Sequence, residues 1–531
     1  MSIQSEATRI INARDDAFDA IGDRGVTVPS GSKIDSLSTY ISQIHTENGV
    51  GNDVIFFDYD GTEIASYSAS AVQNMSSLPQ NPTHTGLVSQ GWNWTLEQIK
   101  TQLVNAPGGQ VFVGQMYLTE SGATEVDFVL PEERKSPYLR FSLNGTAEVD
   151  WGDGSTSTIT GNSLTDNISQ QHNYASGGAY TIKITIPSGS SGVIMMNPNA
   201  HSLLTRNSST GDENRVYSST MKAVRIGNNM GLGIHAFRAC YNIRYITIPS
   251  TVTSFSEAAF RNCYSLKTIT VPSGCTSLPK DFAYNGVTLK YVSVPVEVQS
   301  VGETAFYTNY SLVGFTFLPG MQLNTNSIFL GNRFKNIVIP NGITSIANNV
   351  FQIAYCLESV TLPNGLTKIG NNVFRDVYTL KSINIPSGVT SIGEYAFNSC
   401  MIQNINLPSG ITTINKYTFA TCTALVSVEI PSNVTSIKEG AFSNCCKLTK
   451  ITIPSLVTSI DTKAFNNCFG FKEIHLLPTT PPTLGNTSAF TLISDCIMYV
   501  PYSEDHSILT AYQTATNWSS FVSYMQEEPQ S

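Results

Sequence analysis

Short runs of alternating apolar and polar residues recur along the C-terminal half of the chain. In one run, Ile383 and Ile385 point to one side of an extended segment and Asn384 points to the other, as the two-residue period of a strand requires. A Pro-Ser-Gly or Pro-Asn-Gly turn ends several runs, and a second short extended piece follows, here residues 389–392. Each unit therefore predicts two short strands separated by a turn.

The unit is repeated with a nearly constant period. Its prolines recur every 21 to 24 residues, at Pro249, Pro272, Pro295, Pro319, Pro340, Pro363, Pro386, Pro408, Pro431, Pro454 and Pro478. A period of this length is typical of a solenoid, because one unit is too small to bury its own apolar side and must stack on its neighbours. From Met221 onward the strand pattern occurs twelve times. At roughly 4.8 Å per rung these strands predict a rod or shallow arc of about 55 Å.

A phenylalanine and a cysteine occupy fixed places in most units. The phenylalanine follows an alanine at Phe237, Phe260, Phe306, Phe397, Phe442 and Phe465. Cysteines lie three residues after the unit's phenylalanine at Cys240, Cys263, Cys400, Cys422, Cys445 and Cys468. Equivalent positions form a column in a stack, so we predict free thiols in the core, with inter-rung disulfides or a metal site as alternatives. The unit between Pro319 and Pro340 lacks both features, and we expect a bend or bulge there.

These units resemble the BspA-like leucine-rich repeat family, whose repeats run Ala-Phe-x-x-Cys-x-x-Leu-x-x-Ile-x-Ile-Pro. The resemblance covers residues 221–478, about half of the chain. It implies a right-handed solenoid that serves adhesion and recognition rather than catalysis. After the repeats, residues 479–531 resemble the unit that closes such arrays, with a strand and a helix covering the last rung.

Length and charge narrow the function. A chain of 531 residues is too long for one compact core, so several domains or an elongated array are expected. Its net charge of -9 and its 13% of charged residues give no support to nucleic-acid binding, which needs clustered Lys and Arg. No apolar run approaches the roughly 18 residues of a membrane span, and the first residues lack the pattern of a secretory signal.

The first 47 residues predict two short helices, at 2–21 and 34–44. The apolar residues expected to make attachment contacts are Ile3, Ile10, Ile11, Phe18 and Ile21. So short a stripe is marginal alone, so it packs on a partner, on copies of itself, or on its own chain. The segment resembles the N-termini of phage tail and baseplate proteins. That resemblance implies attachment to a virion assembled in the host cytoplasm, and it makes a homotrimer the expected oligomer.

Residues 48–118 predict a small α+β connector. A hairpin is expected around Asp60-Gly61, and a calcium loop is the alternative, although Phe56 and Tyr67 stand where an EF-hand needs its first and last ligands. The stretch from Gly91 to Ile99 contains two tryptophans before a helix, and we expect these in the core. It resembles connectors that precede repeat arrays in phage proteins.

Residues 119–188 are rich in strand patterns. Trp151-Gly-Asp-Gly followed by His172-Asn-Tyr resembles the PKD-type immunoglobulin-like β-sandwich, which implies a spacer. Asp150 and Asp153 form a candidate pair of catalytic acids, but a turn in which Asp binds its own backbone explains them more simply. Residues 189–220, rich in Gly, Ser and Asn, predict a junction and the first cap of the solenoid.

Stacking turns sequence columns into surface ladders. Tyrosines follow the unit's phenylalanine by four residues at Tyr241, Tyr264, Tyr310, Tyr355 and Tyr378. Outward strand positions add Tyr245 and Tyr291, beside hydroxyl and amide residues such as Asn336, Ser382 and Asn404. The tyrosines are candidate ligand-binding residues because tyrosine packs on sugar rings or protein surfaces, and plain stacking along the rod is the alternative.

The sequence thus predicts a mainly β protein: a leucine-rich-repeat solenoid of about twelve rungs, preceded by a PKD-like sandwich and short N-terminal helices. The function we predict is a phage tail-associated receptor-binding protein whose rod contacts a host glycan or protein. A bacterial cell-surface adhesin with the same rod is the alternative. A depolymerase would need paired acids in a groove, and no catalytic residue, metal site or cofactor is predicted.

Overall fold

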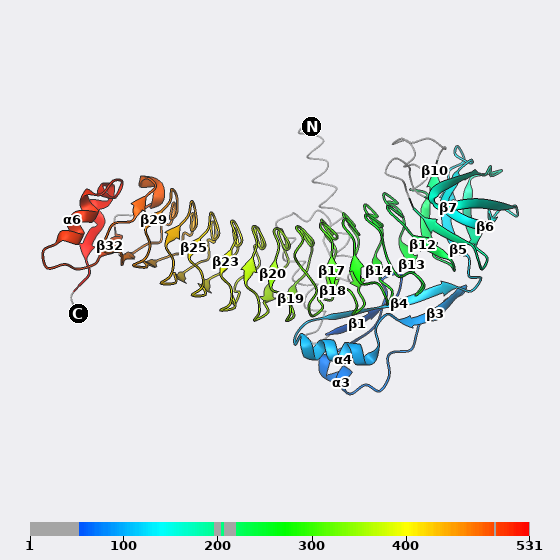
Figure 1. Cartoon of the computed structure of the whole chain (residues 1–531), viewed down its shortest axis with the longest axis horizontal. Helices are drawn as coiled ribbons and strands as arrows, with labels where there is room; N and C mark the ends of the chain where they lie inside the picture. The colour runs from blue at the N-terminus through cyan, green and yellow to red at the C-terminus, as the bar shows by residue number, and fades with distance from the viewer. Residues whose placement is uncertain (1–52, 196–202, 206–218, 493–494, 530–531) are drawn as a thin grey trace, which may run out of the picture.

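The computed structural model describes residues 53–195, 203–205, 219–492 and 495–529. It contains a long, curved rod of stacked rungs with a strand-rich module at its N-terminal end and a small α/β unit beneath that half of the rod (Figure 1). The predicted mainly β solenoid is confirmed, with about 13 turns. The two predicted N-terminal helices and the attachment residues Ile3, Ile10, Ile11, Phe18 and Ile21 lie outside the described residues, as does most of the predicted junction at 189–220.

The connector is a four-stranded sheet with two helices on one face. Its elements are β1 (Val54–Phe57), β2 (Glu63–Tyr67), α3 (Ala69–Gln73), β3 (Leu87–Trp92), α4 (Leu96–Asn105) and β4 (Val111–Thr119). The strand order is β2-β1-β4-β3, with β1 and β4 parallel. The predicted hairpin joins β1 to β2, with Gly61 at a φ of 90°. Helix α4 begins with a capping box between Thr95 and Gln98.

The strand-rich module is built around one long strand. Its strands are β5 (Thr124–Leu130), β6 (Tyr138–Asp150), β7 (Thr156–Gln171), β8 (Gly178–Thr185), β9 (Ser191–Ile194) and β10 (Leu204–Thr205). Strand β6 pairs with β7 on one side and with β10, β9 and β8 in turn on the other. Strand β5 also pairs with β11 (Met221–Arg225), the first rung. The strand-rich module therefore shares one sheet with the first rung of the solenoid and does not form a sheet of its own.

Two rows of short parallel strands run along the rod. The first row continues from β11 through β13 (Tyr245–Thr247), β14 (Thr268–Thr270), β16 (Tyr291–Ser293), β18 (Gly314–Phe315), β19 (Asn336–Val338), β21 (Ser359–Thr361), β24 (Asn404–Asn406), β26 (Ser427–Glu429), β28 (Lys450–Ile453), β30 (Glu473–Leu476) and β32 (Ile497–Val500). The second row contains β12 (Met230–Leu232), β15 (Ser277–Leu278), β17 (Ser300–Val301), β20 (Ser345–Ile346), β22 (Lys368–Ile369), β23 (Ser391–Ile392), β25 (Thr413–Ile414), β27 (Ser436–Ile437), β29 (Ser459–Ile460) and β31 (Thr483–Leu484). The closing strand β32 adds a rung to the twelve predicted.

Stacked phenylalanines hold the rungs together at the side of each unit where Ala-Phe was predicted to enter the core. Phe374 lies 5.5 Å from Phe397, and Phe419 lies 5.4 Å from Phe442, with nearly parallel rings. Two residues per rung bracket this turn in the left-handed region, for example Tyr395 at 57°. Asn, Asp, Ser, Thr, Ala and several larger residues occupy these places, so the sequence did not mark them.

The unit between Pro319 and Pro340 is irregular in sequence, but the bend or bulge expected there stays a prediction. Strand β18 ends one sheet and β19 begins another, and the first row is interrupted in the same way between β13 and β14 and between β26 and β28. Phe329 nevertheless stacks on Phe306 at 5.4 Å and on Phe351 at 6.0 Å. The aromatic core thus continues through a break in the strand row.

The cysteine column is made of buried free thiols, as predicted. All ten cysteines are free. Within the column, Cys422 Sγ donates to the carbonyl oxygen of Phe397 at 3.2 Å, and Cys468 does the same to Phe442 at 3.1 Å. Asn309 Nδ2 occupies the same place and donates to Ala283 O at 2.9 Å. The column therefore supplies a donor to a carbonyl of the preceding rung.

The C-terminal cap closes the core with aromatic residues. Beyond β31 it contains η3 (Thr487–Ala489), β32, α6 (Ser507–Thr514), η4 (Trp518–Tyr524) and β33 (Met525–Glu527), which pairs parallel with β32. Phe490 stacks on Phe465 at 5.1 Å. Tyr512 and Trp518 are fully buried and donate to the carbonyls of Pro478 and Pro482. The predicted strand-and-helix closure is confirmed.

Candidate binding face of the repeat rod

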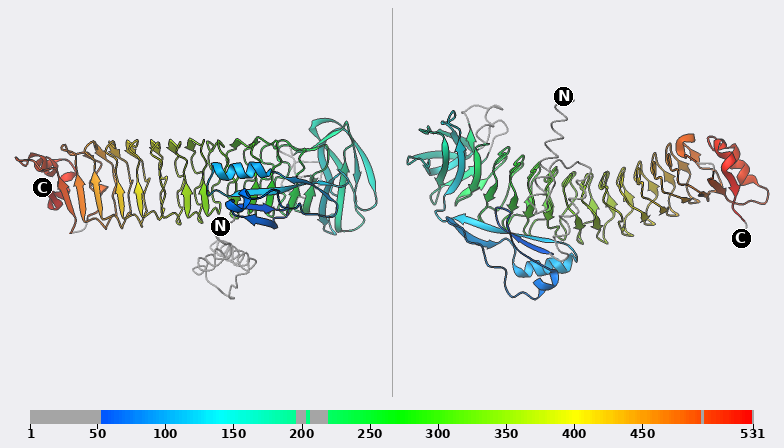
Figure 2. Two further views of the ribbon diagram at one scale, coloured as in Figure 1. Left: turned by 90° about the horizontal axis from the view of Figure 1, so that it is seen from below. Right: turned by 180° about the vertical axis from the view of Figure 1, so that it is seen from behind.

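The connector covers the first strand row at β13 to β18. Figure 2, viewed from below, shows its strands and α4 lying across this part of the rod, while the strands farther along are open to view. Asn93 Nδ2 donates to Val271 O at 2.9 Å, and Trp94 Nε1 donates to Val294 O at 2.8 Å. Gln102 Nε2 reaches Phe317 O at 2.8 Å. The connector therefore binds three successive rungs by their backbone carbonyls.

Aromatic residues fill the same contact. Tyr291 is 5% exposed and lies between Phe57 and Phe112, at ring distances of 5.3 and 5.6 Å. Tyr245 is half-buried and packs edge-on against Tyr59 at 5.0 Å. The ring of Tyr291 is therefore covered by the connector and offers no open surface to a ligand, whereas a binding role for the half-buried Tyr245 stays a prediction. The sequence showed that they point outward but not which segment lies over them.

Hydrogen bonds complete the contact between connector and rod. Ser293 Oγ donates to Phe112 O at 2.7 Å, and Phe112 N donates to Thr316 Oγ1 at 2.9 Å. Thr268 Oγ1 donates to Tyr59 O at 2.8 Å. Trp92 and Trp94 are buried, at 9% and 1% exposure, which confirms that the two tryptophans belong to the core. The connector is a fixed part of the rod in this structure.

The outward positions beyond the connector form a polar surface, which we call the open strand face. Its residues are Asn336, Val338, Ser359, Thr361, Ser382, Asn384, Asn404, Asn406, Ser427 and Glu429. All are exposed except Val338, which is half-buried. Ser359 Oγ donates to Asn336 Oδ1 at 2.7 Å, and Ser427 Oγ donates to Asn404 Oδ1 at 2.8 Å. Hydroxyl and amide groups are thus repeated once per rung along this face.

The predicted tyrosine column forms a second surface, which we call the tyrosine ridge: Tyr241, Tyr264, Tyr310, Tyr355 and Tyr378. Tyr241 stacks on Tyr264 at 4.9 Å, and Tyr355 stacks on Tyr378 at 6.0 Å. Tyr355 and Tyr378 are nevertheless 51% and 53% exposed. Partial burial, together with Asp376 nearby, raises the pKa of both hydroxyls. Stacking and outward exposure therefore occur together, and a binding role for the ridge stays a prediction.

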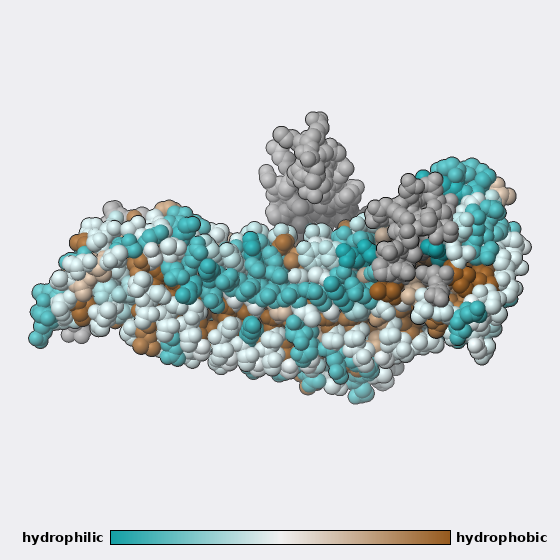
Figure 3. Space-filling view, turned by 45° about the horizontal axis from the view of Figure 1, so that its top comes forward, coloured by the Kyte–Doolittle hydropathy of each residue, from teal (hydrophilic) through white to brown (hydrophobic). Residues whose placement is uncertain are grey.

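The tyrosine ridge contains two stacked pairs of rings. Tyr310, which is 48% exposed, lies between the two pairs in sequence, and the next equivalent position is occupied by the exposed Arg333. The side of the rod seen in Figure 3 is mostly hydrophilic or neutral, with a broken line of hydrophobic residues along its length and further hydrophobic groups near both ends. Broad apolar patches mark large protein interfaces, and the middle of the rod shows only the narrow line in this view.

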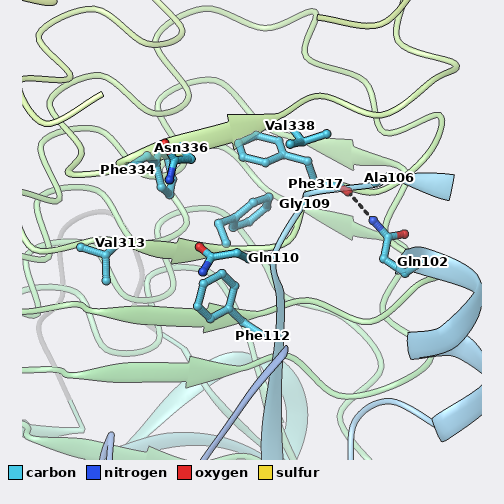
Figure 4. A pocket seen from close by; sticks show the side chains of 11 residues that line it. Gln102, Ala106, Gly109, Gln110, Phe112, Val313, Phe317, Phe334, Asn336 and Val338 are labelled. Atoms are coloured by element: carbon cyan, nitrogen blue, oxygen red, sulfur yellow. Dashed lines mark hydrogen bonds between the residues drawn. The ribbon is translucent and has the colours of Figure 1, made fainter. Parts of the chain in front are cut away.

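A cleft lies where the connector ends and the open strand face begins (Figure 4). Its volume is about 350 Å³, including solvent at its mouth. The connector contributes Gln102, Ala106, Gly109, Gln110 and Phe112, and the rod contributes Val313, Phe315, Phe317, Phe334, Asn336 and Val338. Sequence reasoning missed this cleft because it exists only once the connector has docked beside the irregular unit.

The acidic residues that were considered as a calcium site accept hydrogen bonds from neighbouring backbone and side-chain groups. Asp58 accepts hydrogen bonds from the hydroxyl of Tyr117 at 2.9 Å and from Tyr59 N at 2.8 Å. It also pairs with His84 Nε2 at 2.6 Å. Asp60 Oδ1 accepts from Thr62 N, as a plain turn requires. Within the described ranges, no three His, Cys, Asp or Glu side chains gather closely enough to hold a metal ion.

The Trp-Gly-Asp-Gly segment is also a self-bonded turn. Asp150 Oδ1 accepts from Gly152 N, and Asp153 Oδ1 accepts from the backbone and hydroxyl of Ser155. Asp153 Oδ2 lies 2.7 Å from His172 Nε2. Burial raises the pKa of Asp153, but the hydrogen bonds from Ser155 and His172 outweigh it and lower the pKa to about 2. The two carboxylates stabilise a turn, and the simpler of the two predictions is confirmed.

Comparison with known proteins identifies the repeats. Residues 231–356 and 344–472 match the family model described as the BspA type leucine rich repeat region, in six copies. These residues are therefore BspA-type leucine-rich repeats, and the predicted resemblance holds for this part of the chain. No curated protein matches the chain. In the described part of the chain, no helix has the length and apolar character of a membrane span.

Several solved structures are similar to the chain. A leucine-rich repeat protein from Bacteroides ovatus shares 21% identity, with 65% of this chain and 97% of that one aligned and a TM-score of 0.41. A leucine rich cell surface protein from Faecalibacterium prausnitzii shares 24% identity over 50% of this chain and 86% of that one, with a TM-score of 0.31. The pneumococcal vaccine antigen PcpA shares 14% identity over 65% and 87%, with a TM-score of 0.34.

Proposed function

We propose that this chain is a host-recognition protein of a phage tail, in which residues 1–47 attach to the tail or baseplate and the repeat rod binds the host surface. The observation that carries the recognition role is the division of one strand row into a covered part and an open part. The open strand face repeats hydroxyl and amide groups over successive rungs, and the connector reaches only its first rung, at Asn336 and Val338 beside the cleft. Such a ladder suits an extended ligand with repeating polar groups, a glycan or a protein.

The virion location and the homotrimer rest on the sequence of the first 47 residues and on its resemblance to phage tail and baseplate proteins. The predicted spacer role of the PKD-like module does not fit its place, because the connector, which follows the attachment segment directly, already docks on the rod. The module instead extends the first rung, where β5 pairs with β11 and Arg225 donates to Glu125 and Asp127. An ion pair this well hydrogen-bonded fixes the orientation of two segments.

A bacterial cell-surface adhesin is the second candidate. The match of residues 231–472 to BspA-type repeats favours it as much as the first, because both functions use the same rod. The two differ in where the chain is found, on purified phage particles or on the bacterial surface. A depolymerase lacks support, because Asp150 and Asp153 are engaged in their own turn.

Deletion of residues 1–47 tests the attachment. We expect particles assembled with the shortened chain to lack it, while the purified chain keeps its thermal unfolding temperature and its adsorption to host cells. Normal incorporation of the shortened chain would contradict the attachment role. Finding the full chain on the surface of uninfected bacteria would favour the adhesin instead.

A second test asks which surface binds. One variant replaces Tyr241, Tyr264 and Tyr378 by Ala on the tyrosine ridge, and a matched variant replaces Ser359, Asn404 and Ser427 by Arg on the open strand face. We expect the open-face variant to lose adsorption to host cells. The ridge variant decides whether the tyrosines contribute. If neither changes adsorption, the rod is not the recognition surface.

A further inference from the structure

The connector reveals an acceptor that each rung offers. The carbonyls bound by Asn93, Trp94 and Gln102 belong to Val271, Val294 and Phe317, which share one register position in three consecutive rungs. Figure 4 shows the last of these bonds, from Gln102 at the cleft. The donors are side-chain N–H groups of the connector, whose strands and α4 lie across the strand row (Figure 2). The backbone of a rung can therefore be recognised from outside.

The repeated proline explains why such a carbonyl is available. Thr270 lies opposite Ser293 in the parallel pair, so Val271 lies opposite Val294. In a parallel ladder the residue after Val294 would donate to Val271 O, but that residue is Pro295, which has no N–H. The final rung supplies the control, because Leu477 stands at this position and its N–H donates to Ile453 O at 3.0 Å. Proline therefore leaves this acceptor free at most rungs. Val294 O is an exception, because Leu318 stands at its donor position and Trp94 nevertheless binds this carbonyl.

The open strand face repeats the same arrangement. Val338 lies opposite Thr361, which places Pro363 where a donor to Ile339 O is needed. Asn406 lies opposite Glu429, which places Pro431 where a donor to Leu407 O is needed. By the same spacing, the carbonyls without a ladder donor are those of Ile339, Leu362, Ile385, Leu407 and Ile430. These carbonyls continue the series formed by Val271 O, Val294 O and Phe317 O under the connector. We call the whole series the carbonyl track.

The side chains beside the two parts of the track differ in kind. Under the connector, a protein contact, the outward residues include Tyr245 and Tyr291, and the connector brings Trp94 and Phe112. Protein interfaces are usually anchored by such aromatic residues. From Asn336 to Glu429 no outward residue is aromatic and only Glu429 is charged, whereas Lys450, Glu473 and His475 follow at the next two rungs. The stretch from Asn336 to Glu429 therefore suits a ligand that is polar, uncharged and rich in hydroxyl groups.

We propose that the open strand face binds an extended, uncharged polysaccharide whose hydroxyl groups donate to the proline-freed carbonyls of successive rungs and exchange hydrogen bonds with the neighbouring Asn and Ser side chains. This proposal rests on the recognition role proposed above and names the ligand class. The chain would run along the rod, since the acceptors repeat at the strand spacing of about 4.8 Å. Its path starts beside the cleft, where Gln102 takes the last covered carbonyl.

The decisive variant restores the missing donor without changing the outward side chains. Pro363→Ala and Pro431→Ala together give N–H groups that can donate to Ile339 O and Leu407 O, as Leu477 does to Ile453 O. The matched control is Pro249→Ala, whose ladder partner is Ile226, outside the open strand face. Full-length proteins are compared by thermal unfolding and by binding to immobilised neutral glucans, mannans and galactans, with heparin as the anionic comparison.

We expect wild type and the Pro249→Ala control to bind at least one neutral polysaccharide. The double variant should stay folded and bind it about 25-fold to 100-fold more weakly, about fivefold to tenfold for each lost hydrogen bond. Equal binding by the double variant would overturn the carbonyl track. Binding of heparin alone, or of no polysaccharide by a chain that still adsorbs to host cells, would overturn the ligand class and leave the recognition role standing. Loss of all adsorption would instead contradict the recognition role.

Discussion

The covered and open parts of the first strand row have the same backbone arrangement but different outward side chains. Under the connector, the outward residues at successive rungs are Tyr245, Thr268, Tyr291 and Gly314, and they pack on or bond to another part of the chain. From Asn336 to Ser427 the same positions hold Asn and Ser, and these are exposed. One repeat thus serves two purposes, and the outward residue of the strand decides between them.

The two parts of the rod share their core features and differ in whether another part of the chain docks on them. Both parts share the phenylalanine stack, the thiol column and the carbonyl freed by proline. Among the described residues, only the covered part has a partner whose side chains match the spacing of the rungs, with Asn93 and Trp94 adjacent in sequence and Gln102 farther along on α4. Recognition of a rung therefore depends on a row of donors in register with its strands.

The largest effect should come from removing the central anchor of the connector. Trp94→Ala deletes a side chain that is 1% exposed and leaves Val294 O without its donor. We expect a loss of about 3 to 5 kcal/mol for the covered part. Hydrogen exchange should rise in residues 268–317, while residues 359–430 keep their protection.

Val104→Ala is the matched control, because Val104 lies on α4, the connector helix that follows Trp94, and is 68% exposed. Its effect should stay within about 0.5 kcal/mol. If Trp94→Ala left exchange in residues 268–317 unchanged, the connector would not stabilise these rungs. The covered and open parts of the rod would then differ only in their outward side chains and not in stability.

The second effect tests the outward position directly. A Cβ on Gly314 would lie 2.5 Å from Phe112 Cε1 and 2.6 Å from Tyr291 Cδ1, so Gly314→Val overpacks the contact and should cost about 1 to 3 kcal/mol. Ser359 is the residue at the open end of the same row, and Ser359→Val should change stability by about 0.5 kcal/mol or less. Thermal unfolding of both variants checks the difference, and equal effects would show that the connector does not press on the strand row.

The sequence predicted most of the rod and little of the contact. A strict period of 21 to 24 residues determines which side chains stack, so the strands, the phenylalanine column and the free thiols followed from the pattern. It also showed that Tyr245 and Tyr291 point outward. It did not show that the connector lies over them, because that contact joins residues about 200 apart in the chain, such as Trp94 and Val294. Docking of one unit on another depends on shape, which a repeat pattern does not encode.

The third effect should be the same in both parts, because the thiol column lies inside the rungs. Cys263→Ala and Cys422→Ala each remove a buried thiol that donates to a carbonyl, so each should cost about 1 to 2 kcal/mol. Burial raises the pKa of both thiols to about 12. Iodoacetamide at pH 8 should therefore spare them in the folded protein and modify Cys446, which is exposed. Rapid labelling of Cys263 or Cys422 would show that the core opens.

The smallest effect concerns backbone conformation and has opposite signs in the two parts. Ile353, beyond the connector, and Asn262, at a rung under it, occupy the same left-handed position, with φ of 61° and 60°. A β-branched residue is strained there, whereas Asn is tolerated. Ile353→Asn should therefore raise the free energy of unfolding by about 0.5 to 1 kcal/mol, and Asn262→Ile should lower it by at least as much. Denaturant unfolding of the two variants measures both changes. Changes of the same sign would mean that side-chain contacts, and not the backbone, decide which residue this position accepts.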